Sequence, residues 1–299
     1  MHLLEKRRQD ISQQLTSYLT NKNTQTIIII IKIYTTMPGE FLPVYSLLDS
    51  ALNPYFCMNK KFLIQTIKGK VVHDFAFTLE RALEYQAWRG EKFETEYVEG
   101  FVENYPMTPN SIPIGTVEFV HFYLGLLGIN PPPPLNVPRS LIPWALGVKD
   151  DMNFEPGKKY YYKSIKNIKD PSNGSYVYLD YPPPSIDLFQ VREYIPDIVS
   201  EWRGFIYRGD LVGLHNYSGN FTCYPDIKVI RECIKAWIEM NKNEAYTLDF
   251  GISEKHGTFV LEAHRFYSCG LYGFSDYQIL PWMFIRTWNG ITKNTIISE

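Results

Sequence analysis

Three residues near the C-terminal end of the chain, Asp249, Glu262 and His264, have the types and spacing to bind a divalent metal ion. Polar and apolar residues alternate on both sides of a polar turn, which predicts a β-hairpin. A turn centred between Lys255 and His256 would place Asp249 directly opposite Glu262, with His264 one step along the same face. Two opposed carboxylates repel each other unless a cation lies between them. The pattern therefore favours Mg²⁺ with a nucleotide, and solvated acids on a hairpin edge are the alternative.

The same alternation assigns the apolar side chains of the hairpin to a core-facing side. Val260 is expected on the opposite face, beside Glu262. The side chains expected against the core are Tyr246, Leu248, Phe250, Phe259, Leu261 and Ala263.

The length and composition of the chain limit the classes of protein to which it can belong. At 299 residues the chain can bury a large core in two or three subdomains. A formal net charge of −2 argues against a broad nucleic-acid-binding surface, which needs clustered positive charge. The high aromatic content of 15% suits strand-rich walls and a cleft for planar groups.

The location of the protein is expected to be cytoplasmic. Its four cysteines are scattered without the spacing of a zinc site, which indicates free thiols in a reducing compartment. The apolar run Ile27–Ile31 is too short to cross a bilayer, and no signal peptide is visible, so no membrane partner is expected. In a virus, this compartment would be the host cytoplasm.

The first half of the chain reads as mixed α/β structure after a polar extension at residues 1–25. Ile27–Tyr34 is a short β-branched run that predicts a buried strand. Thr78–Arg89 and Thr116–Leu127 have the pattern of helices, and a glycine follows each of them. Pro131–Pro134 then forms a stiff spacer that marks the boundary to a different texture.

Strands and hairpins dominate the second half. A tight turn at Gly209–Asp210 is expected to join two of the strands. Asp226 is expected to cap a helix that runs to about Asn241, and Tyr277–Trp288 predicts a closing helix. The expected strands are Lys159–Ile165, Ser175–Leu179, Phe189–Tyr194, Trp202–Tyr207 and Leu211–Tyr217.

A series of short motifs surrounds the hairpin. In chain order they are YYK (Tyr161–Lys163), QVREYI (Gln190–Ile195), EWR (Glu201–Arg203), DFG (Asp249–Gly251), LEAH (Leu261–His264) and GLYG (Gly270–Gly273). This order resembles the ATP-grasp superfamily, and most of all its phage and bacterial clade named for one arginine and two lysines. The stretches at Ile112–Val120 and Asn136–Leu141 also resemble that clade, so the resemblance covers roughly residues 26–285.

The resemblance implies a fold of class α/β (α+β) with the ATP-grasp architecture. In it, an N-terminal α/β region precedes two strand-rich subdomains that clamp a nucleotide. The expected division is residues 1–25 as an extension, 26–145 as the N-terminal α/β domain and 146–299 as the ATP-grasp domain. Within the last, residues 146–188 form the lysine-bearing subdomain and 189–299 the hinge and metal-binding subdomain.

The resemblance also implies roles for basic residues around ATP. Lys163 would bind the α and β phosphates, and Lys169 or Lys166 would be the second phosphate lysine. A solvated basic strand edge is the alternative for these lysines. Arg203 would stabilise the γ-phosphate or the acyl-phosphate, and an ion pair with Glu201 or Glu193 is its structural alternative.

The segment between the two subdomains is expected to hold the nucleoside. Glu193 would accept hydrogen bonds from the ribose hydroxyls, and the backbone around Tyr194 and Ile195 would receive adenine. The alternative for Glu193 is an exposed hinge acid.

The metal ligands implied by the resemblance are Asp249, Glu262 and His264, holding Mg²⁺ against the phosphates. His264 stands where the family usually has asparagine. Because imidazole is a better ligand for Mn²⁺ than for Mg²⁺, one option is a histidine ligand with a changed metal preference, so that Mn²⁺ becomes an alternative ion. In the other options, water replaces it while the histidine contacts substrate, or activity is impaired.

The function implied is an ATP-dependent carboxylate–amine (or carboxylate–nucleophile) ligase that forms an acyl-phosphate. Its partners would be a small-molecule or peptide acid and an amine acceptor, and peptide or protein tagging is the use that the clade suggests. The alternatives are a non-catalytic nucleotide-binding module and a small-molecule kinase on the same fold. A P-loop, a nucleophile elbow and an HExxH zinc motif are all absent from the sequence. Cys269 as a nucleophile and His215 as part of the acceptor pocket each compete with a simple packing role.

Overall fold

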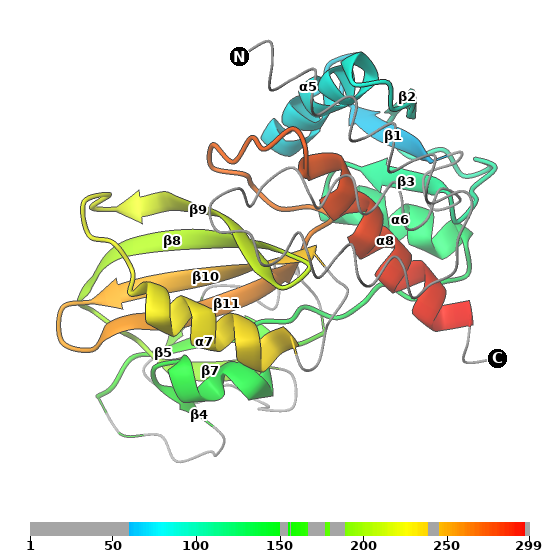
Figure 1. Cartoon of the computed structure of the whole chain (residues 1–299). Coiled ribbons are helices and arrows are strands. Elements are labelled where there is room, and N and C mark those ends of the chain that lie inside the picture. The colour runs from blue at the N-terminus through cyan, green and yellow to red at the C-terminus, as the bar shows by residue number, and fades with distance from the viewer. Residues whose placement is uncertain are drawn as a thin grey trace, which may run out of the picture. The chain divides into compact units, whose positions relative to one another are not determined.

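The computed structural model describes residues 60–149, 155, 157–166, 177–179, 189–238 and 245–296. From Lys61 onward these residues belong to one compact unit (Figure 1). The predictions for residues 1–25, Ile27–Tyr34 and Lys169 lie outside the described residues. The predicted domain boundaries stay predictions. The described residues have the mixed α/β architecture expected of the ATP-grasp fold, with three separate sheets.

The first sheet is parallel, with strand order β2-β1-β3. The fully buried centre of β1 explains its place between the other two strands, because parallel sheets are covered on both faces. The predicted helices are confirmed, although α5 begins four residues before Thr78 because Phe75 and Ala76 continue its buried face. The bounds are β1 Lys61–Thr66, α5 Asp74–Trp88, β2 Glu94–Glu99, β3 Ser111–Ile114 and α6 Val117–Leu126.

Local sequence signals begin and end these helices. The hydroxyl of Thr116 accepts a hydrogen bond of 3.1 Å from the Phe119 amide and caps α6. Gly90 and Gly128 follow α5 and α6 with φ values of 93° and 71°, a backbone region that favours glycine.

The second sheet is antiparallel, with order β4-β7-β5-β6. Side chains of β5 alternate between its faces: Tyr160 and Tyr162 are buried with Val191, while Tyr161 and Lys163 lie on the other face. The predicted strands are confirmed within a few residues. The bounds are β4 Val148–Lys149, β5 Tyr160–Ser164, β6 Val177–Leu179 and β7 Phe189–Glu193.

The third sheet is also antiparallel, with order β11-β10-β8-β9. Arg208 and Gly209 form the tight turn between β8 and β9, one residue earlier than predicted, because Tyr207 pairs with Asp210. Both turn residues have positive φ, 56° and 88°, which matches the twist of the flanking strands. The bounds are β8 Ile198–Tyr207, β9 Asp210–Gly219, β10 Ala245–Ser253 and β11 Gly257–Arg265.

The predicted hairpin is confirmed, and Asp249 pairs with Glu262 as expected. Its turn is one residue shorter than predicted, and a β-bulge beside Asp249 compensates for the difference. The bulge leaves Leu261 without a register partner and reverses the faces beyond it. The assignment of Leu261 to the core and Val260 to the acid face is therefore wrong: Val260 lies in the core and Leu261 lines a cavity.

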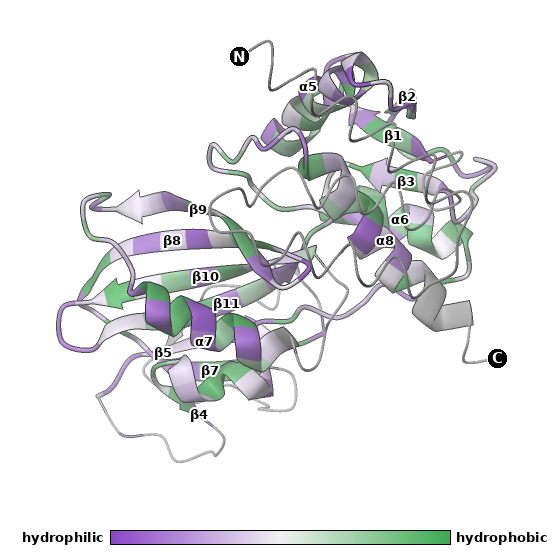
Figure 2. Ribbon diagram, in the orientation of Figure 1, coloured by the Kyte–Doolittle hydropathy of each residue, from purple (hydrophilic) through white to green (hydrophobic). Residues whose placement is uncertain are grey.

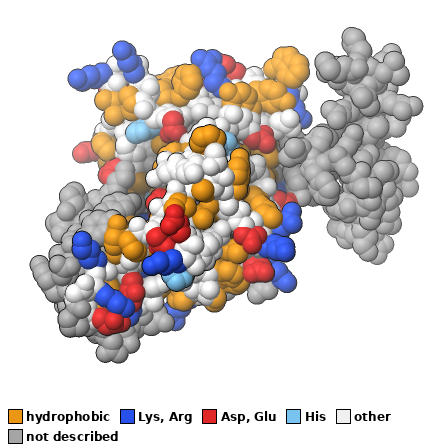
Figure 3. Space-filling model, turned by 90° about the vertical axis from the view of Figure 1, so that its left-hand side faces the viewer, with side chains coloured by type: hydrophobic (Ala, Val, Ile, Leu, Met, Phe, Trp, Pro, Cys, Tyr) orange, Lys and Arg blue, Asp and Glu red, His pale blue; other side chains and the backbone are white. Residues whose placement is uncertain are grey.

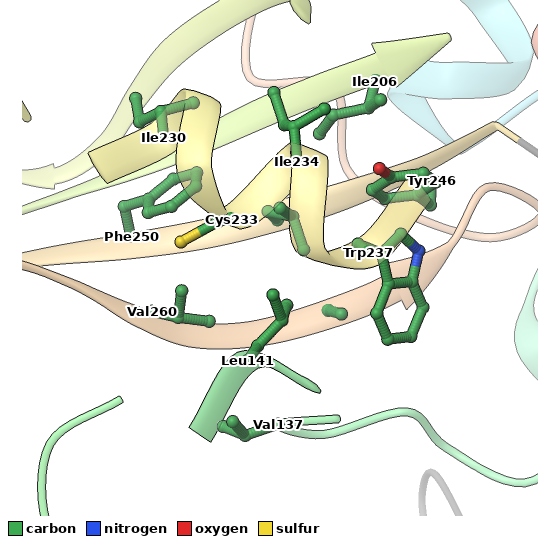
Figure 4. Close-up of a cluster of buried hydrophobic side chains, with 12 residues drawn as sticks. Val137, Leu141, Ile206, Ile230, Cys233, Ile234, Trp237, Tyr246, Phe250 and Val260 are labelled. Carbon is green, nitrogen blue, oxygen red and sulfur yellow. The ribbon is translucent and has the colours of Figure 1, made fainter. Parts of the chain in front are cut away.

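The helix α7, Ile227–Ile238, covers one face of this sheet (Figure 1). Asp226 caps it as predicted, accepting a hydrogen bond of 2.8 Å from the Lys228 amide. Hydrophobic and hydrophilic residues recur along it as in an amphipathic helix (Figure 2). Figure 4 shows Ile234 of this helix beside Ile206 of β8 and Trp237 beside Tyr246 of β10, in a cluster that also contains Leu141. Leu141 belongs to the short 3-10 helix η1, Arg139–Trp144.

The closing helix α8, Leu280–Ile296, begins three residues after the predicted start. The Asp276 carboxylate and carbonyl accept hydrogen bonds from the amides just before the helix, which form a turn there. Pro281 lies in the first turn, where its missing N–H is tolerated. Among the described residues, none of the helices combines the length and hydropathy of a membrane span. On the face shown in Figure 3, acidic and basic side chains are interspersed.

Candidate active site

A cavity of about 370 Å³ lies between the second and third sheets. Both sheets present charged side chains to it, which is unusual for a packing defect and typical of a polar ligand site. It includes every predicted site residue that the structure describes except Lys166. Its lining residues are Asn136, Tyr161, Lys163, Gln190, Arg192, Glu193, Tyr194, Ile195, Ile198, Glu201, Arg203, Tyr217, Asp249, Leu261, Glu262, His264 and Tyr272.

The predicted metal ligands come together on one face of the β10–β11 pair, where Asp249 pairs with Glu262. Asp249, Glu262 and His264 each offer one ligand atom, and these atoms lie within 4.8 Å of one another. The His264 Nε2 atom is 3.0 Å from the Glu262 carboxylate and 3.6 Å from that of Asp249, without the geometry of a hydrogen bond to either. Burial lowers the pKa of His264, although Asp249 opposes this, so the imidazole is held neutral. Two carboxylates and a neutral imidazole around one point fit a divalent ion.

Arg203 forms an ion pair with Asp249 at the buried side of this cluster. Its Nε and Nη2 atoms donate hydrogen bonds of 2.7 Å to the two oxygens of the Asp249 carboxylate. Burial alone would raise the pKa of Asp249, but the hydrogen bonds from Arg203 hold it at about 2. The sequence analysis gave an ion pair with Glu201 or Glu193 as the structural alternative for Arg203. The ion pair that Arg203 forms is with Asp249 instead.

Lys163 lies on β5 and contacts the Glu262 carboxylate from the opposite sheet. Burial, together with Arg192 and Arg203, lowers the pKa of Lys163 to about 8, while Asp249 opposes the shift. The side chain therefore carries a positive charge at neutral pH inside the cavity. Lys166 is exposed at the end of the strand and is not among the lining residues. Lys169 is outside the described residues.

The predicted hinge residues Glu193, Tyr194 and Ile195 all line the cavity. The Glu193 carboxylate is 3.3 Å from Lys149 and 3.6 Å from Lys158, and strand alternation puts its side chain on the face of Val191. The amides of Glu193 and Tyr194 donate to Gly147 and Lys159. Of the hinge amides, that of Ile195 has no hydrogen-bond partner among the described residues.

Two tyrosines that the sequence did not single out enclose Arg203. The rings of Tyr217 and Tyr272 are stacked, with centroids 5.0 Å apart and planes at 24°. The Arg203 guanidinium carbon lies 5.8 Å from the Tyr217 centroid and 5.0 Å from that of Tyr272. Tyr272 belongs to the glycine-bearing loop that the motif series marked, and its φ of 49° is left-handed. The GLYG motif identified the loop that carries Tyr272. The stacking partner, Tyr217, lies on β9, far away along the chain, so the sequence did not reveal the contact.

Packing roles explain Cys269 and His215. Burial raises the pKa of the Cys269 thiol to about 12, which disfavours the thiolate form that a nucleophile needs. His215 pairs with Arg203 in the register, but its ring packs edge-on against Phe205 and Phe274 and does not line the cavity.

Comparisons with known proteins agree with the motif series. Residues 188–281 match a family described as an ATP-grasp domain, family 2 of the clade named for one arginine and two lysines. A sequence search of curated proteins finds no match.

Solved structures resemble the chain distantly. They include an N5-carboxyaminoimidazole synthetase from Staphylococcus aureus, with 11% identity and a TM-score of 0.48 over 76% of this chain and 77% of that one. A D-alanyl-alanine synthetase A from Vibrio cholerae has 13% identity and a TM-score of 0.44 over 78% and 100%. A D-alanine–D-alanine ligase from Bacillus anthracis has 12% identity and a TM-score of 0.44 over 79% and 99%. The family match carries the assignment for the part of the chain that it covers: residues 188–281 are similar to an ATP-grasp domain of the one-arginine, two-lysine clade.

Proposed function

We propose that the protein is an ATP-dependent, ADP-forming ligase that joins a carboxylate to an amine, or to another nucleophile, through an acyl-phosphate. One observation carries the proposal. A single cavity holds a lysine from β5 and a carboxylate–carboxylate–imidazole cluster from β10 and β11, and most of its lining lies within the ATP-grasp match. Cationic and metal-binding groups facing each other across a cleft are what a triphosphate requires.

The nucleoside would bind at the hinge. The Ile195 amide is the donor proposed for adenine, because the amides of Glu193 and Tyr194 are already engaged. Glu193 is proposed to contact the ribose, which requires its carboxylate to exchange a contact with Lys149 or Lys158 for the hydroxyls. Lys163 would bind the α and β phosphates, with Lys169 or Lys166 as the second lysine.

A divalent ion would be held by Asp249, Glu262 and His264, with Mg²⁺ or Mn²⁺ as candidates. When bound, such an ion neutralises charge on the phosphate oxygens. Each carboxylate oxygen has two lone pairs, so Asp249 can accept from Arg203 and still offer a ligand. Lys163 would exchange its contact with Glu262 for one with the phosphates. Glu262 would then have the divalent ion as its counter-ion in place of Lys163.

The reaction would proceed in two displacements. The carboxylate oxygen of the acid attacks the γ-phosphorus, the bond from that phosphorus to the β–γ bridging oxygen breaks, and ADP leaves. The amine then attacks the acyl carbon, phosphate leaves with its oxygen, and the amine gives up a proton. Lys163 and the N–H groups of Arg203 not bound to Asp249 or Gly270 would offset the growing negative charge.

The reacting groups must be shielded from water, since an acyl-phosphate hydrolyses readily. We propose that the loop at residues 268–273 closes over the nucleotide; the sequence also predicted a covering loop at residues 166–174, of which residues 167–174 lie outside the described residues. Two hydrogen bonds of 2.9 Å anchor the loop at residues 268–273, from Leu271 to Asp74 and from Ser268 to Gly115. Tyr272 lies between these anchors and the end of the loop, beside Arg203.

The substrates would be a small-molecule or peptide acid and an amine acceptor. Tagging of a peptide or protein, in a phage or bacterial setting, is the form that the resemblance to the clade implies.

The test is ADP and phosphate release from Mg-ATP, or Mn-ATP, across sets of acids and amines. Release that needs both metal and an added acid, with hydroxamate formed when hydroxylamine replaces the amine, is the expected result. ATP binding without turnover on any set would instead indicate a non-catalytic module. A stable phosphorylated product with no need for an acceptor would indicate a kinase.

A further inference from the structure

Arg192 is a cavity residue that the proposed ligase chemistry has not used. It lies on β7, where its register partner is Tyr161, and two positions away Gln190 pairs with Lys163. Side chains two residues apart on a strand share a face, so Arg192 and Lys163 project from the same face of the second sheet. Both line the cavity.

The contacts of Arg192 hold its guanidinium across the cavity toward the third sheet. Its Nη1 atom donates a hydrogen bond of 3.0 Å to the Leu261 carbonyl. Leu261 is the residue left without a register partner by the β-bulge of β11. The guanidinium carbon also lies 5.5 Å from the centroid of the Tyr161 ring. The head group is therefore positioned by a carbonyl on one side and an aromatic ring on the other.

No carboxylate lies within ion-pair distance of Arg192 among the residues that the structure describes, and only one of its five N–H donors has a hydrogen-bond partner there. The other cations of the cavity are engaged: Arg203 by Asp249 and Lys163 by Glu262. Burial lowers the pKa of Arg192, opposed by Tyr161, Tyr217 and Glu201, but a guanidinium stays charged at any ordinary pH. Arg192 is half-buried, and a charge partly withdrawn from water without a counter-ion favours the arrival of an anion.

We propose that Arg192 binds a phosphate oxyanion of the nucleotide, as a cation additional to Lys163 and to Arg203. This inference rests on the proposed function. A phosphate offers two oxygens to the parallel N–H groups of a guanidinium, and Lys163 on the same face would contact the same phosphate chain. Arg192 also directly precedes the hinge residues proposed for the nucleoside. Arg203, by contrast, already has Asp249 as its counter-ion.

The experiment measures binding of ATP, ADP, adenosine and inorganic tripolyphosphate by the full chain, with calorimetry, for the wild type and three variants. Arg192→Gln removes the charge, and Arg192→Lys keeps the charge without the paired donors. Arg231→Gln is the matched control, since Arg231 is exposed on α7 and outside the cavity. Circular dichroism checks the fold of each variant.

We expect Arg192→Gln to weaken ATP binding by on the order of 10- to 100-fold, as for lost hydrogen bonds between charged groups, and to leave adenosine binding unchanged. Arg231→Gln should match the wild type. Should Arg192→Gln not fold, a fall of several-fold in the ratio of ATP to adenosine affinity in Arg192→Lys supports the proposal, and an unchanged ratio overturns it.

Equal losses for ATP and adenosine would overturn the proposal in favour of a purely structural role at Leu261, and so would wild-type ATP binding by Arg192→Gln. Failure of the proposed function looks different. If the wild type binds tripolyphosphate through Arg192 but does not bind ATP, the proposed ligase function is wrong while the anion site at Arg192 stands.

Discussion

Arg203 and Asp249 are register partners on β8 and β10, and two hydrogen bonds of 2.7 Å join the guanidinium to both oxygens of the carboxylate. Their side chains are only 7% and 2% exposed. The ion pair therefore forms the buried floor of the cavity, and it holds Asp249 in the orientation in which it meets Glu262 and His264. A charge in such a position depends on its partner far more than a surface charge does.

Arg203→Gln should destabilise the fold by about 3–5 kcal/mol, because it leaves the Asp249 carboxylate buried without its counter-ion. Urea unfolding followed by circular dichroism measures the change. The double variant Arg203→Met, Asp249→Leu should recover much of that loss, since both charges are gone. A loss below about 1 kcal/mol in Arg203→Gln, the range of surface ion pairs, would show that solvent reaches the pair.

Glu262→Gln should lower metal-dependent ATP turnover by at least about 100-fold and leave the fold intact, because a ligand oxygen with its charge is lost from the proposed metal site. The matched control is Glu254→Gln in the exposed hairpin turn, which should keep wild-type turnover. ADP release is the readout. Unchanged turnover in Glu262→Gln would remove the hairpin from the mechanism.

Lys163→Ala should weaken ATP binding by about 10-fold, the effect of one lost charge-assisted hydrogen bond of about 1.5 kcal/mol. Lys166→Ala serves as the comparison, because Lys166 is exposed and outside the cavity. Binding titrations with and without metal measure both. Wild-type affinity in Lys163→Ala would move the phosphate contact to Lys166 or Lys169.

His264→Asn places the residue usual in the family at this position and should shift the metal preference toward Mg²⁺. The reason is that an amide oxygen is a harder ligand than imidazole nitrogen, which suits Mn²⁺ better. The measurement is the ratio of turnover with Mn²⁺ to turnover with Mg²⁺, expected to fall several-fold. An unchanged ratio would indicate that His264 contacts substrate or water instead of the ion.

The stability of the protein should fall as the pH drops below about 6.5, in part through His121. Burial lowers the pKa of His121, with Glu118 opposing, and its Nε2 atom is 3.1 Å from the Tyr267 hydroxyl. The unfolded chain then binds a proton that the folded chain resists, so the free energy of unfolding decreases toward acid. His121→Gln should make this decrease shallower between pH 7 and pH 5 in urea titrations. An equally steep decrease would assign the effect to other histidines.

Features encoded by neighbouring residues could be predicted from the sequence. The alternation of side chains and the polar turn predicted the pairing of Asp249 with Glu262, and the structure confirms it. Asp226 caps its helix through the amide two residues away, as predicted, because a cap depends on neighbouring residues only. The order of motifs likewise pointed to the ATP-grasp superfamily, which the family match supports at residues 188–281.

Features that depend on contacts between distant strands were decided by the tertiary structure. The bulge that turns Val260 inward and Leu261 toward the cavity accompanies a hairpin turn one residue shorter than the alternation predicted. The pairing of Arg203 with Asp249 joins positions 46 residues apart. Arg192 faces the cavity only through its register with β5. Side-chain period and capping are local properties of a chain, whereas the register between non-consecutive strands is set by the packing of the whole sheet.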